Sequence, residues 1–568
     1  MKSYPHFSQR KVIPLDGTWD FTFLGNVPVN HIDISSITFT DKMIVPAAYD
    51  ALPAYAGKRG LAVYRKFIRI SPGSLARIHF EAVSMWCQVY IDGINCGEHA
   101  CGYSGFWVDL PSSGQDIREL VVLVDNRFDL ERIPLHEPYF DFYHWGGIIR
   151  SAWLHEVPTS FIDTVHISVL DFENGKINVK IKFGGEHVDN VPLKFYIDDK
   201  PLTGGNYSIQ DGIVKVDLDV PNPQPWSIQS PKLYQMKVIY LEDDMIVRFG
   251  LRKVETSGKQ ILLNGKPIKL LGYNRHESHP QFGPAVPDSL MLADLQMLRD
   301  LGANFIRGSH YQQDQRFLDL CDEMGFLVWE EALGWQQLPR HFNDTNYVKA
   351  HFAQIREMIS TSYNHPCVIM LGFLNEAHTE ADSAKPLFDE TIALIKSLDP
   401  DRLVTYATCR LKQDICLEPV DVVSLNIYPG WYPGWGETWD ENDPSRLIQP
   451  AMHDCLKFLE ESGLGDRPVI FSEIGADAIY GWHDPMQGHW TEEYQAKYLD
   501  KVCEEVTGNE NISGLSIWQF CDVRSAPNYY SLHRPRAFNN KGTVDEYRRP
   551  KQAYGVVKSY FSKMDVRK

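Results

Sequence analysis

The chain of 568 residues lacks any long apolar run, and its first ten residues contain no apolar core of the kind that a signal peptide needs. Membrane spanning and secretion therefore have no support, and we expect a cytoplasmic protein. Basic residues are also fewer than acidic ones, 56 against 74, for a net charge of −18. This balance disfavours attraction to phosphate backbones and anionic lipids. We predict neither a nucleic-acid partner nor a membrane partner.

The chain has only ten cysteines and no Cys-x-x-Cys pair, which is too few for a fold held together by disulfides. Cys96 and Cys101 are too isolated to suggest a zinc site. We expect reduced thiols that mostly pack in cores, with no metal and no other cofactor.

About 250 residues at the start are dominated by short alternating or β-branched runs, separated by Gly, Pro, Asn and Asp at the spacing of β-sandwiches. One block ends near Pro158, and a second block of about a hundred residues follows. We predict one β-sandwich over residues 1–158 and an immunoglobulin-like sandwich over residues 159–255.

From residue 256 onward the pattern changes to a strand followed by a helix, repeated. The strand candidates are continuous apolar runs, as expected for parallel strands buried on both faces. One predicted helix carries Met291, Leu295, Leu298 and Leu301 at the helical period, behind a cap at Asp288. The pattern predicts a (β/α)₈ barrel over 256–568 with strands at 270–274, 304–307, 327–330, 368–375, 403–407, 422–426, 469–473 and 514–518. A doubly wound open sheet is the alternative, but no Gly-rich phosphate turn follows the first strand.

Polar residues gather where these apolar strands end, which is where a barrel builds its active site. Glu376 follows the fourth strand and Glu473 ends the seventh, so both are predicted at one barrel mouth. A carboxylate at the end of a buried strand is costly to desolvate, so two such carboxylates at one barrel mouth indicate a functional role. Paired carboxylates across a cleft are what glycoside hydrolysis requires. The other polar or aromatic residues at strand ends are Asn274, Arg275, His276, Glu277, Arg307, Ser309, His310, Glu330, Glu331, Asn375, Asn426, Tyr428 and Trp518.

Several segments of the chain resemble glycoside hydrolase family 2, and they cover nearly its whole length. They are 15–19, 90–93, 102–106 and 147–150 in the β-rich half, and 274–277, 301–311, 364–366, 375–376 and 472–475 in the barrel half. The resemblance implies a jelly-roll sugar-binding domain, an immunoglobulin-like domain and a catalytic barrel, in that order. It also implies self-association, so we expect a homo-oligomer.

The resemblance further implies a retaining exo-β-glycosidase with Glu376 as general acid/base and Glu473 as nucleophile. Arg307 and Tyr428 are the donors that we expect to keep Glu473 charged. Asn375 is similar to the family residue that holds the sugar 2-hydroxyl. His276 and His310 match family histidines that line the sugar pocket, and no third ligand suggests a metal there. Aromatic faces for the sugar are expected from Trp335, Trp431, Trp435, Tyr428 and Trp518.

A short motif after the eighth strand indicates the sugar. Asn539-Asn540-Lys541 resembles the Asn-x-Lys element by which the β-glucuronidase branch of the family holds a sugar carboxylate. An amide and an ammonium suit a carboxylate, and a neutral hexose would leave Lys541 unpaired. Asp141 and the strand-six pattern with Asn426 match the same branch.

The chain departs from this branch at Pro535, where an arginine is common, and we expect a neighbour, Arg534 or Arg536, to substitute. Arg536 is included in the predicted substrate-binding set. Arg340, after the third strand, is a further cation within possible reach of the sugar. We therefore predict hydrolysis of small-molecule β-D-glucuronides. A β-galacturonidase or a dual enzyme stays open as the alternative, a β-galactosidase is less favoured, and a non-catalytic carbohydrate-binding protein is least favoured.

Overall fold

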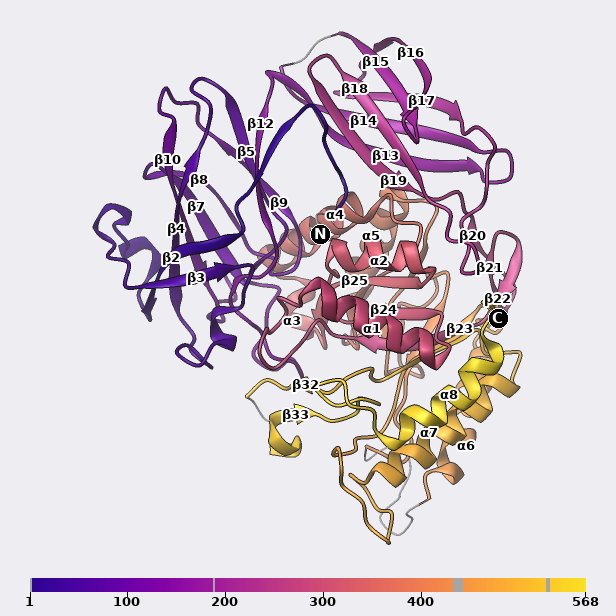
Figure 1. Cartoon of the computed structure of the whole chain (residues 1–568). Helices are drawn as coiled ribbons and strands as arrows, with labels where there is room; N and C mark the ends of the chain where they lie inside the picture. Colours follow the sequence, from indigo (N-terminus) through magenta and orange to yellow (C-terminus); the bar gives the residue numbers. More distant parts are fainter. Residues whose placement is uncertain (1–2, 187–188, 433–442, 528–531, 568) are drawn as a thin grey trace.

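The computed structural model describes residues 3–186, 189–432, 443–527 and 532–567. Three regions follow one another along the chain, a jelly-roll β-sandwich, an immunoglobulin-like β-sandwich and a (β/α)₈ barrel (Figure 1). The fold class predicted from the sequence is confirmed. Trp435 lies outside the described residues.

The jelly-roll region consists of a four-stranded sheet in the order β1-β12-β5-β9 and a six-stranded sheet in the order β3-β2-β4-β10-β7-β8, with β11 and β6 as a short pair. Apolar side chains from both sheets, among them Trp19, Phe21 and Tyr64, fill the space between them. The strands are β1 (Lys11–Pro14), β2 (Gly17–Gly25), β3 (Asp41–Val45), β4 (Leu61–Arg69), β5 (Leu75–Phe80), β6 (Val83–Ser84), β7 (Trp86–Ile91), β8 (Ile94–His99), β9 (Phe106–Leu110), β10 (Ile117–Asp125), β11 (Gly147–Ile148) and β12 (Ala152–Val157).

The immunoglobulin-like region pairs a three-stranded sheet, β13-β14-β17, with a four-stranded sheet, β16-β15-β18-β19. Strand β14 shows why these segments fold as half-buried strands: Ile177, Val179 and Ile181 are buried, whereas Lys180 and Lys182 between and beyond them are exposed. The strands are β13 (Ser160–Asp171), β14 (Lys176–Gly185), β15 (Asn190–Ile197), β16 (Lys200–Ser208), β17 (Ile213–Asp219), β18 (Tyr234–Tyr240) and β19 (Asp243–Phe249).

A small antiparallel sheet of β20 (Val254–Ser257), β21 (Gln260–Leu263) and β22 (Lys266–Ile268) leads into the barrel. The barrel sheet runs in the order β27-β26-β25-β24-β23-β31-β30-β29-β28, all parallel. Its strands are β23 (Leu270–Arg275), β24 (Phe305–Gly308), β25 (Leu327–Trp335), β26 (Val368–Asn375), β27 (Leu403–Thr405), β28 (Ala407–Thr408), β29 (Val423–Asn426), β30 (Val469–Ile474) and β31 (Gly514–Ile517). The fifth predicted strand is therefore present as two pieces, β27 and β28, which flank Tyr406.

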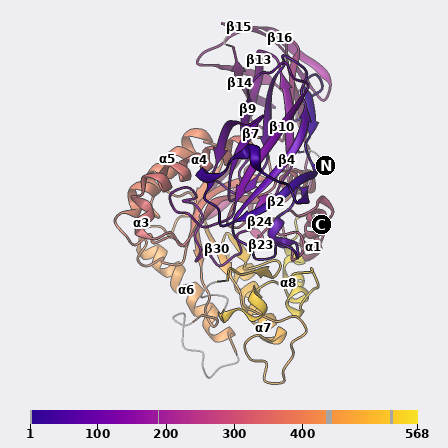
Figure 2. The ribbon, with the colours of Figure 1, turned by 90° about the vertical axis from the view of Figure 1, so that its left-hand side faces the viewer.

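Helices surround the barrel strands (Figure 2). They are α1 (Asp288–Leu301), α2 (Gln315–Met324), α3 (Pro339–Phe342), α4 (Thr345–Ser362), α5 (Ala384–Leu398), α6 (Ser445–Glu461), α7 (Glu492–Gly508) and α8 (Gln552–Met564). The predicted apolar face of α1 is buried, but Pro287 rather than Asp288 precedes its first turn. Asp288 instead pairs with Arg316 at 2.8 Å. A short hairpin of β32 (Val523–Arg524) and β33 (Phe538–Asn539) follows the last barrel strand.

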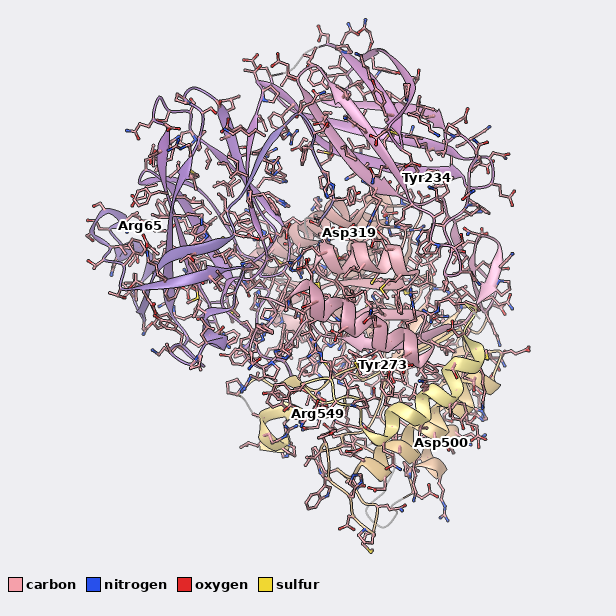
Figure 3. All side chains as sticks on the ribbon, in the orientation of Figure 1. Arg65, Tyr234, Tyr273, Asp319, Asp500 and Arg549 are labelled. Atoms are coloured by element: carbon pink, nitrogen blue, oxygen red, sulfur yellow. The ribbon has the colours of Figure 1, made fainter. Side chains whose placement is uncertain are left out.

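The jelly-roll region packs directly on the barrel beside the ends of its strands. Arg150 donates to Glu277 at 2.9 Å, and both side chains are buried. Tyr103 stacks on Tyr311 with ring centroids 3.8 Å apart. Elsewhere the amide of Tyr4 donates to Asp319 of α2, one of the labelled side chains in Figure 3. Residues of the first region are thereby placed where they contribute to a site at the barrel mouth.

All ten cysteines are free, and eight of them are buried. Among the described helices, none combines the length and the apolar character needed to cross a bilayer.

Candidate active site

A cavity of about 260 Å³ lies at the carboxyl ends of the barrel strands and contains both predicted carboxylates. The jelly-roll region contributes Asp141 and Phe142 to its wall, and the segments that follow the barrel strands contribute the rest. The described residues that line it are Asp141, Phe142, His310, Trp335, Gln336, Glu376, Cys409, Tyr428, Tyr432, Glu473, Trp518, Arg534 and Asn539.

Glu473 lies at the end of β30 among strong hydrogen-bond donors. Its Oε1 accepts from Arg307 Nη1 at 2.8 Å, and its Oε2 accepts from the Tyr428 hydroxyl at 2.7 Å. Nε2 of His310 lies 3.8 Å from the same Oε1. The predicted donors Arg307 and Tyr428 thus both contact Glu473. Donors of this strength favour the ionised form of a carboxylate.

Glu376 directly follows β26, and its backbone is left-handed, with φ of 53°. Its Oε1 accepts a hydrogen bond from Asn426 Nδ2, and its Oε2 accepts one from Gln336 Nε2, both at 3.0 Å. Both donors are neutral amides, in contrast to the guanidinium beside Glu473. The two carboxylates therefore share one cavity but have unlike partners.

The two carboxyl groups are electrostatically coupled. Burial, and after it the charge of Glu376, raises the pKa of Glu473 to about 8, against the opposing effects of Arg307 and Tyr428. This direction differs from the expectation that donors alone keep Glu473 ionised. Coupled carboxyls titrate as a pair, and below about pH 8 this pair holds a proton. Because a guanidinium faces Glu473 and neutral amides face Glu376, the contacts favour the negative charge of the pair on Glu473.

Asn375 lies between the two carboxylates in the hydrogen-bond network. Its Oδ1 accepts from Arg307 Nη2 at 2.8 Å and from Asn426 Nδ2 at 3.0 Å. Its Nδ2 is buried and has no hydrogen-bond partner within the described ranges of the chain. A buried donor without a partner is costly, so this amide is available to a polar group of a bound molecule.

The predicted histidines lie next to each other at this cavity, with ring centroids 5.5 Å apart. Burial lowers the pKa of His276 and of His310 well below the usual value, so both imidazoles are neutral at pH 7. Nδ1 of His310 is 3.0 Å from Glu331 Oε1, and Trp518 stacks on the same imidazole at 5.1 Å. His310 and Trp518 line the cavity, whereas His276 lies beside His310.

One wall of the cavity carries a cation held between carboxylates. Arg534 Nη2 donates to Asp141 Oδ2 at 2.5 Å and to the Tyr432 hydroxyl at 2.8 Å. Asn539 Nδ2 donates to the same Asp141 oxygen at 3.3 Å. Asp141 and Asn539, both predicted from the sequence, therefore meet at this wall. The cation that lines the cavity is Arg534.

Lys541 lies behind this wall and is fully buried. Its Nζ donates to the carboxylate of Asp477 and, at 2.8 Å, to the Tyr432 hydroxyl. Burial, and after it the charge of Arg534, lowers the pKa of Lys541 to about 8. Burial acts to raise the pKa of Asp477, but the charges of Lys541 and Arg534 outweigh it and hold that pKa below its usual range. Lys541 thus has a counter-ion of its own, and the expectation that a neutral sugar would leave it unpaired does not hold.

Two other predicted cations do not reach the cavity. Arg536 pairs with Glu546 at 2.7 Å, and 41% of its side chain is exposed. Its backbone is left-handed, with φ of 63°, rather than extended. Arg340 pairs with Glu137 at 2.8 Å, and more than half of its side chain is exposed. Arg534 therefore takes the place that the sequence assigned to Arg536.

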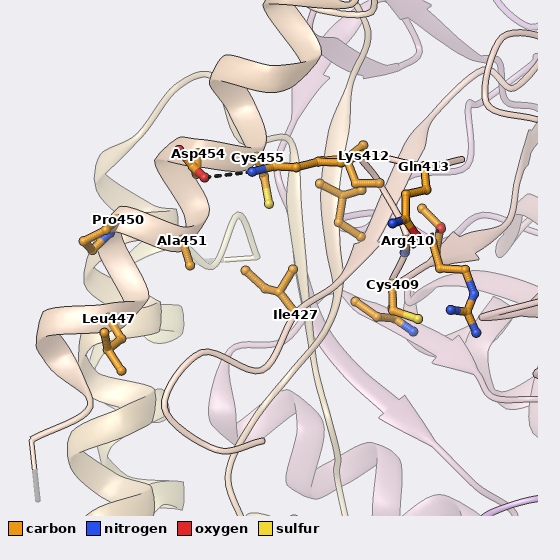
Figure 4. A pocket seen from close by; sticks show the side chains of 14 residues that line it. Cys409, Arg410, Lys412, Gln413, Ile427, Leu447, Pro450, Ala451, Asp454 and Cys455 are labelled. Carbon is orange, nitrogen blue, oxygen red and sulfur yellow. Dashed lines mark hydrogen bonds and ion pairs between the residues drawn. The ribbon is translucent and has the colours of Figure 1, made fainter. Parts of the chain in front are cut away.

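A second cavity, of about 800 Å³, lies between α6 and the segments that follow β28 and β29 (Figure 4). Cys409 lines both cavities, so they lie side by side. Lys412 and Asp454 form an ion pair of 3.1 Å at the wall of the second cavity.

Among the described residues, one group of potential metal ligands comes together, Asp322, His365 and Cys367. None of the three lines the cavity that contains Glu376 and Glu473. His365 donates or accepts through both ring nitrogens, to Asp322 at 2.6 Å and to Gln315 at 3.1 Å. These contacts satisfy the imidazole with protein partners.

The sequence reasoning did not single out Gln336, Cys409 or Asp477, and Tyr432 entered it only as part of the strand-six segment that matches the β-glucuronidase branch. Gln336 directly follows the last residue of β25, so its place after a strand was the available signal. Asp477 comes four residues after Glu473, and Tyr432 four residues after Tyr428. No local pattern connects either one with Lys541.

The family model described as "Glycosyl hydrolases family 2, TIM barrel domain" matches residues 254–566, and the model described as "Glycosyl hydrolases family 2" matches residues 160–252. The first match alone covers more than half of the chain. The chain therefore belongs to glycoside hydrolase family 2 and is a glycoside hydrolase, as the motifs predicted.

Individual relatives are similar over almost the full length. The β-glucuronidase of Streptococcus agalactiae is 27% identical over 607 aligned residues, covering 98% of this chain and 97% of that protein. The solved β-galacturonidase of Eisenbergiella tayi, bound to galacturonate, is 34% identical with a TM-score of 0.89, covering 99% and 98% of the two chains. The β-glucuronidase of Bifidobacterium dentium, complexed with coumarin-3-O-glucuronide, is 25% identical with a TM-score of 0.85, covering 97% of each chain.

Proposed function

We propose that this protein is a retaining exo-β-glycosidase that releases a terminal hexuronic acid from small-molecule β-D-hexuronides. The observation that carries the proposal is the pair of carboxylates in one cavity, Glu473 held by a guanidinium and Glu376 by amides. A nucleophile and an acid need such unequal surroundings.

In the first step, the ionised Glu473 attacks the anomeric carbon and forms a glycosyl ester. Glu376 gives its proton to the departing glycosidic oxygen, so that the aglycone leaves as a neutral alcohol or phenol. Arg307 and Tyr428 hold the Glu473 carboxylate in place. The free Nδ2 of Asn375 is available to the sugar 2-hydroxyl, a contact that strengthens in the transition state.

In the second step, Glu376, now ionised, removes a proton from water while the water oxygen attacks the anomeric carbon. The ester bond to Glu473 breaks, its electron pair returns to the carboxylate, and hexuronic acid leaves with the β configuration. The first step needs the pair to hold one proton, which is its state below about pH 8, and the second step returns that proton to Glu376.

The sugar carboxylate is proposed to bind at the wall formed by Arg534, Asn539 and Tyr432, with Lys541 behind it. Arginine and amide donors suit a carboxylate. We propose glucuronides as the principal substrates. Galacturonides are the second candidate, because the Eisenbergiella tayi β-galacturonidase matches this chain with 34% identity over 99% of its length.

The test is a parallel assay on 4-nitrophenyl β-D-glucuronide, β-D-galacturonide and β-D-galactoside. We expect turnover of at least one uronide at a kcat/KM far above that of the galactoside. Preferred turnover of the galactoside would contradict the uronide proposal. Proton NMR of the first product tests retention, for which the β-anomer must appear before mutarotation.

We also propose the limits of the three domains as 1–158, 159–255 and 256–568, a cytoplasmic location, and a homo-oligomer. The exposed side chains Ile44, Phe67 and Ile117 on strands of the six-stranded sheet offer apolar area for self-association. Light scattering of the purified protein tests the oligomer, and a monomeric mass at micromolar concentration would contradict it.

A further inference from the structure

Gln336 joins the loop after β25 to the proposed acid, Glu376. Its Nε2 donates to Glu376 Oε2 at 3.0 Å, and its backbone N–H donates to Asn375 O at 2.7 Å. The backbones of Gln336 and Glu376 are both left-handed, with φ of 51° and 53°. Non-glycine residues rarely adopt this conformation, and it persists where the surroundings impose it. The backbone is thus strained at both residues that the hydrogen bond from Gln336 Nε2 to Glu376 Oε2 connects.

The jelly-roll region fixes the same loop. The hydroxyl of Tyr139 donates to the carbonyl oxygen of Gln336 at 3.2 Å, and Gln336 itself lines the catalytic cavity. The first region of the chain therefore reaches Glu376 through a single residue.

The side-chain amides of Asn426 and Gln336, which both contact Glu376, differ in whether they can flip to exchange their oxygen and nitrogen positions. Arg307 can only donate, so Asn375 must present Oδ1 to it, and Asn426 must then present Nδ2 to that same Oδ1. Asn426 Oδ1 receives the hydroxyl of Ser472 at 2.7 Å. Asn426 is therefore fixed as a donor to Glu376 Oε1.

No comparable chain of contacts fixes Gln336. In the described part of the protein, its side-chain amide makes only the hydrogen bond to Glu376 Oε2. Turning this amide over exchanges a donor for an acceptor without changing its shape. Gln336 can thus face either protonation state of Glu376 with the matching atom.

We propose that Gln336 is the positioning residue for the catalytic proton of Glu376. When Glu376 is ionised, Gln336 Nε2 donates to Oε2. When Glu376 is protonated, the proton is on its Oε2, because its Oε1 faces the fixed N–H of Asn426. The amide oxygen of Gln336 then accepts a hydrogen bond from this O–H. The inference rests on the proposed role of Glu376 as acid and base.

Proton transfer then proceeds through one oxygen. The proton leaves Oε2 for the glycosidic oxygen as the glycosidic bond breaks, and Gln336 turns its Nε2 toward the new carboxylate. In the second step, Oε2 takes the proton from the attacking water, and the amide turns back.

The experiment compares Gln336→Met with Gln337→Met on two uronides of different leaving-group quality. Gln337 is a matched control, since it is the buried neighbour, its amide atoms have no hydrogen-bond partner among the described residues, and it is not part of the cavity wall. The ratio kcat/KM reports the first step, in which the acid acts. A phenyl uronide needs a proton on its leaving oxygen, whereas a 2,4-dinitrophenyl uronide leaves without one.

For Gln336→Met we expect kcat/KM to fall by about 10- to 100-fold on the phenyl uronide and by less than about threefold on the dinitrophenyl uronide. Gln337→Met should change neither by more than about twofold. In Gln336→Glu, a carboxylate replaces the amide beside Glu376, and the alkaline limb of the rate profile should move to higher pH.

An equal loss on both substrates, or no loss on either, would overturn the inference for Gln336. The variant Glu376→Gln separates this outcome from failure of the proposed function. If Glu376→Gln shows the leaving-group dependence and Gln336→Met does not, only the inference is wrong. If Glu376→Gln lacks the dependence as well, the acid is misassigned and both fail.

Discussion

Replacement of Arg534 by glutamine tests where the sugar carboxylate binds. Arg534 is the cation that lines the cavity, and it holds Asp141 at 2.5 Å and Asp477 at 3.3 Å. Its loss removes a charged hydrogen bond to a uronate, worth about 1.5–3 kcal/mol, and takes the guanidinium away from the partly buried carboxylate of Asp141 and the buried carboxylate of Asp477. We therefore expect a loss of about 2–4 kcal/mol of transition-state binding, or about 30- to 1000-fold in kcat/KM.

Arg536→Gln is the matched control, because it removes the other arginine beside Pro535. The Arg536 side chain is 41% exposed, and its ion pair with Glu546 is the kind of partly exposed pair that contributes about 0–1 kcal/mol. We expect less than a twofold change in kcat/KM for this variant. The Arg534→Lys variant keeps the charge without the planar fork, and it should fall between the parent and Arg534→Gln.

The assay measures kcat/KM on a 4-nitrophenyl uronide and on the corresponding neutral glycoside, together with the midpoint of thermal unfolding of each variant. A uronide-specific loss in Arg534→Gln is the expected result. Equal losses on uronide and neutral glycoside would refute the carboxylate-binding role of Arg534. A larger uronide loss in Arg536→Gln than in Arg534→Gln would refute the placement of the two arginines.

Three further predictions follow from the carboxylate pair and its neighbours. For Glu376→Ala, kcat/KM should fall by about 100-fold or more on a phenyl uronide and much less on a dinitrophenyl uronide. Added azide should restore turnover of this variant and give a β-glycosyl azide as the product. An α-glycosyl azide would contradict retention. The kcat/KM of the parent should decline above about pH 8, where the pair loses its proton and Lys541 its charge, and a flat profile to pH 9.5 would contradict this. For Glu473→Gln, the gain in thermal midpoint over the parent should be larger at pH 8 than at pH 5. In the folded parent the coupled pair keeps a proton up to about pH 8, whereas exposed carboxyl groups of the unfolded chain lose theirs near about pH 4.3, so the parent loses stability as pH rises between these values; an equal gain at both pH values would contradict this.

The barrel could be predicted from the sequence because its strands are buried on both faces. Every residue of β26 and of β30 is buried, and such continuous apolar runs are distinctive. The division of the fifth strand at Tyr406 could not be predicted, since Leu403 to Ala407 has the composition of one strand. Backbone hydrogen bonds, rather than composition, decide where such a run breaks.

The carboxylates were predictable for a related reason, because a polar residue at the end of an apolar strand has a known position in a barrel. Side-chain direction in irregular segments was not predictable. Arg536 and Ala537 both have left-handed backbones, with φ of 63° and 59°, so the alternation of an extended chain does not apply to this segment. The amino-acid sequence of this segment contains no signal for the left-handed backbone.

Partners distant in sequence were also beyond prediction. Asp477 and Lys541 are 64 residues apart, and they meet because the segments after β30 and β31 lie side by side. Because Asp477 is a counter-ion for Lys541, the presence of Lys541 does not by itself require a substrate with a carboxylate. Preference for a uronide then depends on the cavity-lining donors, and on Arg534 above all.

The proposed nucleophile is tested most directly by trapping the glycosyl-enzyme with a 2-deoxy-2-fluoro-hexuronosyl fluoride and mapping the labelled peptide by mass spectrometry. We expect one hexuronosyl group per chain, bound as an ester to Glu473, with no label in Glu473→Gln. A label on Glu376, or steady turnover of this reagent with no covalent intermediate and an inverted product, would contradict it.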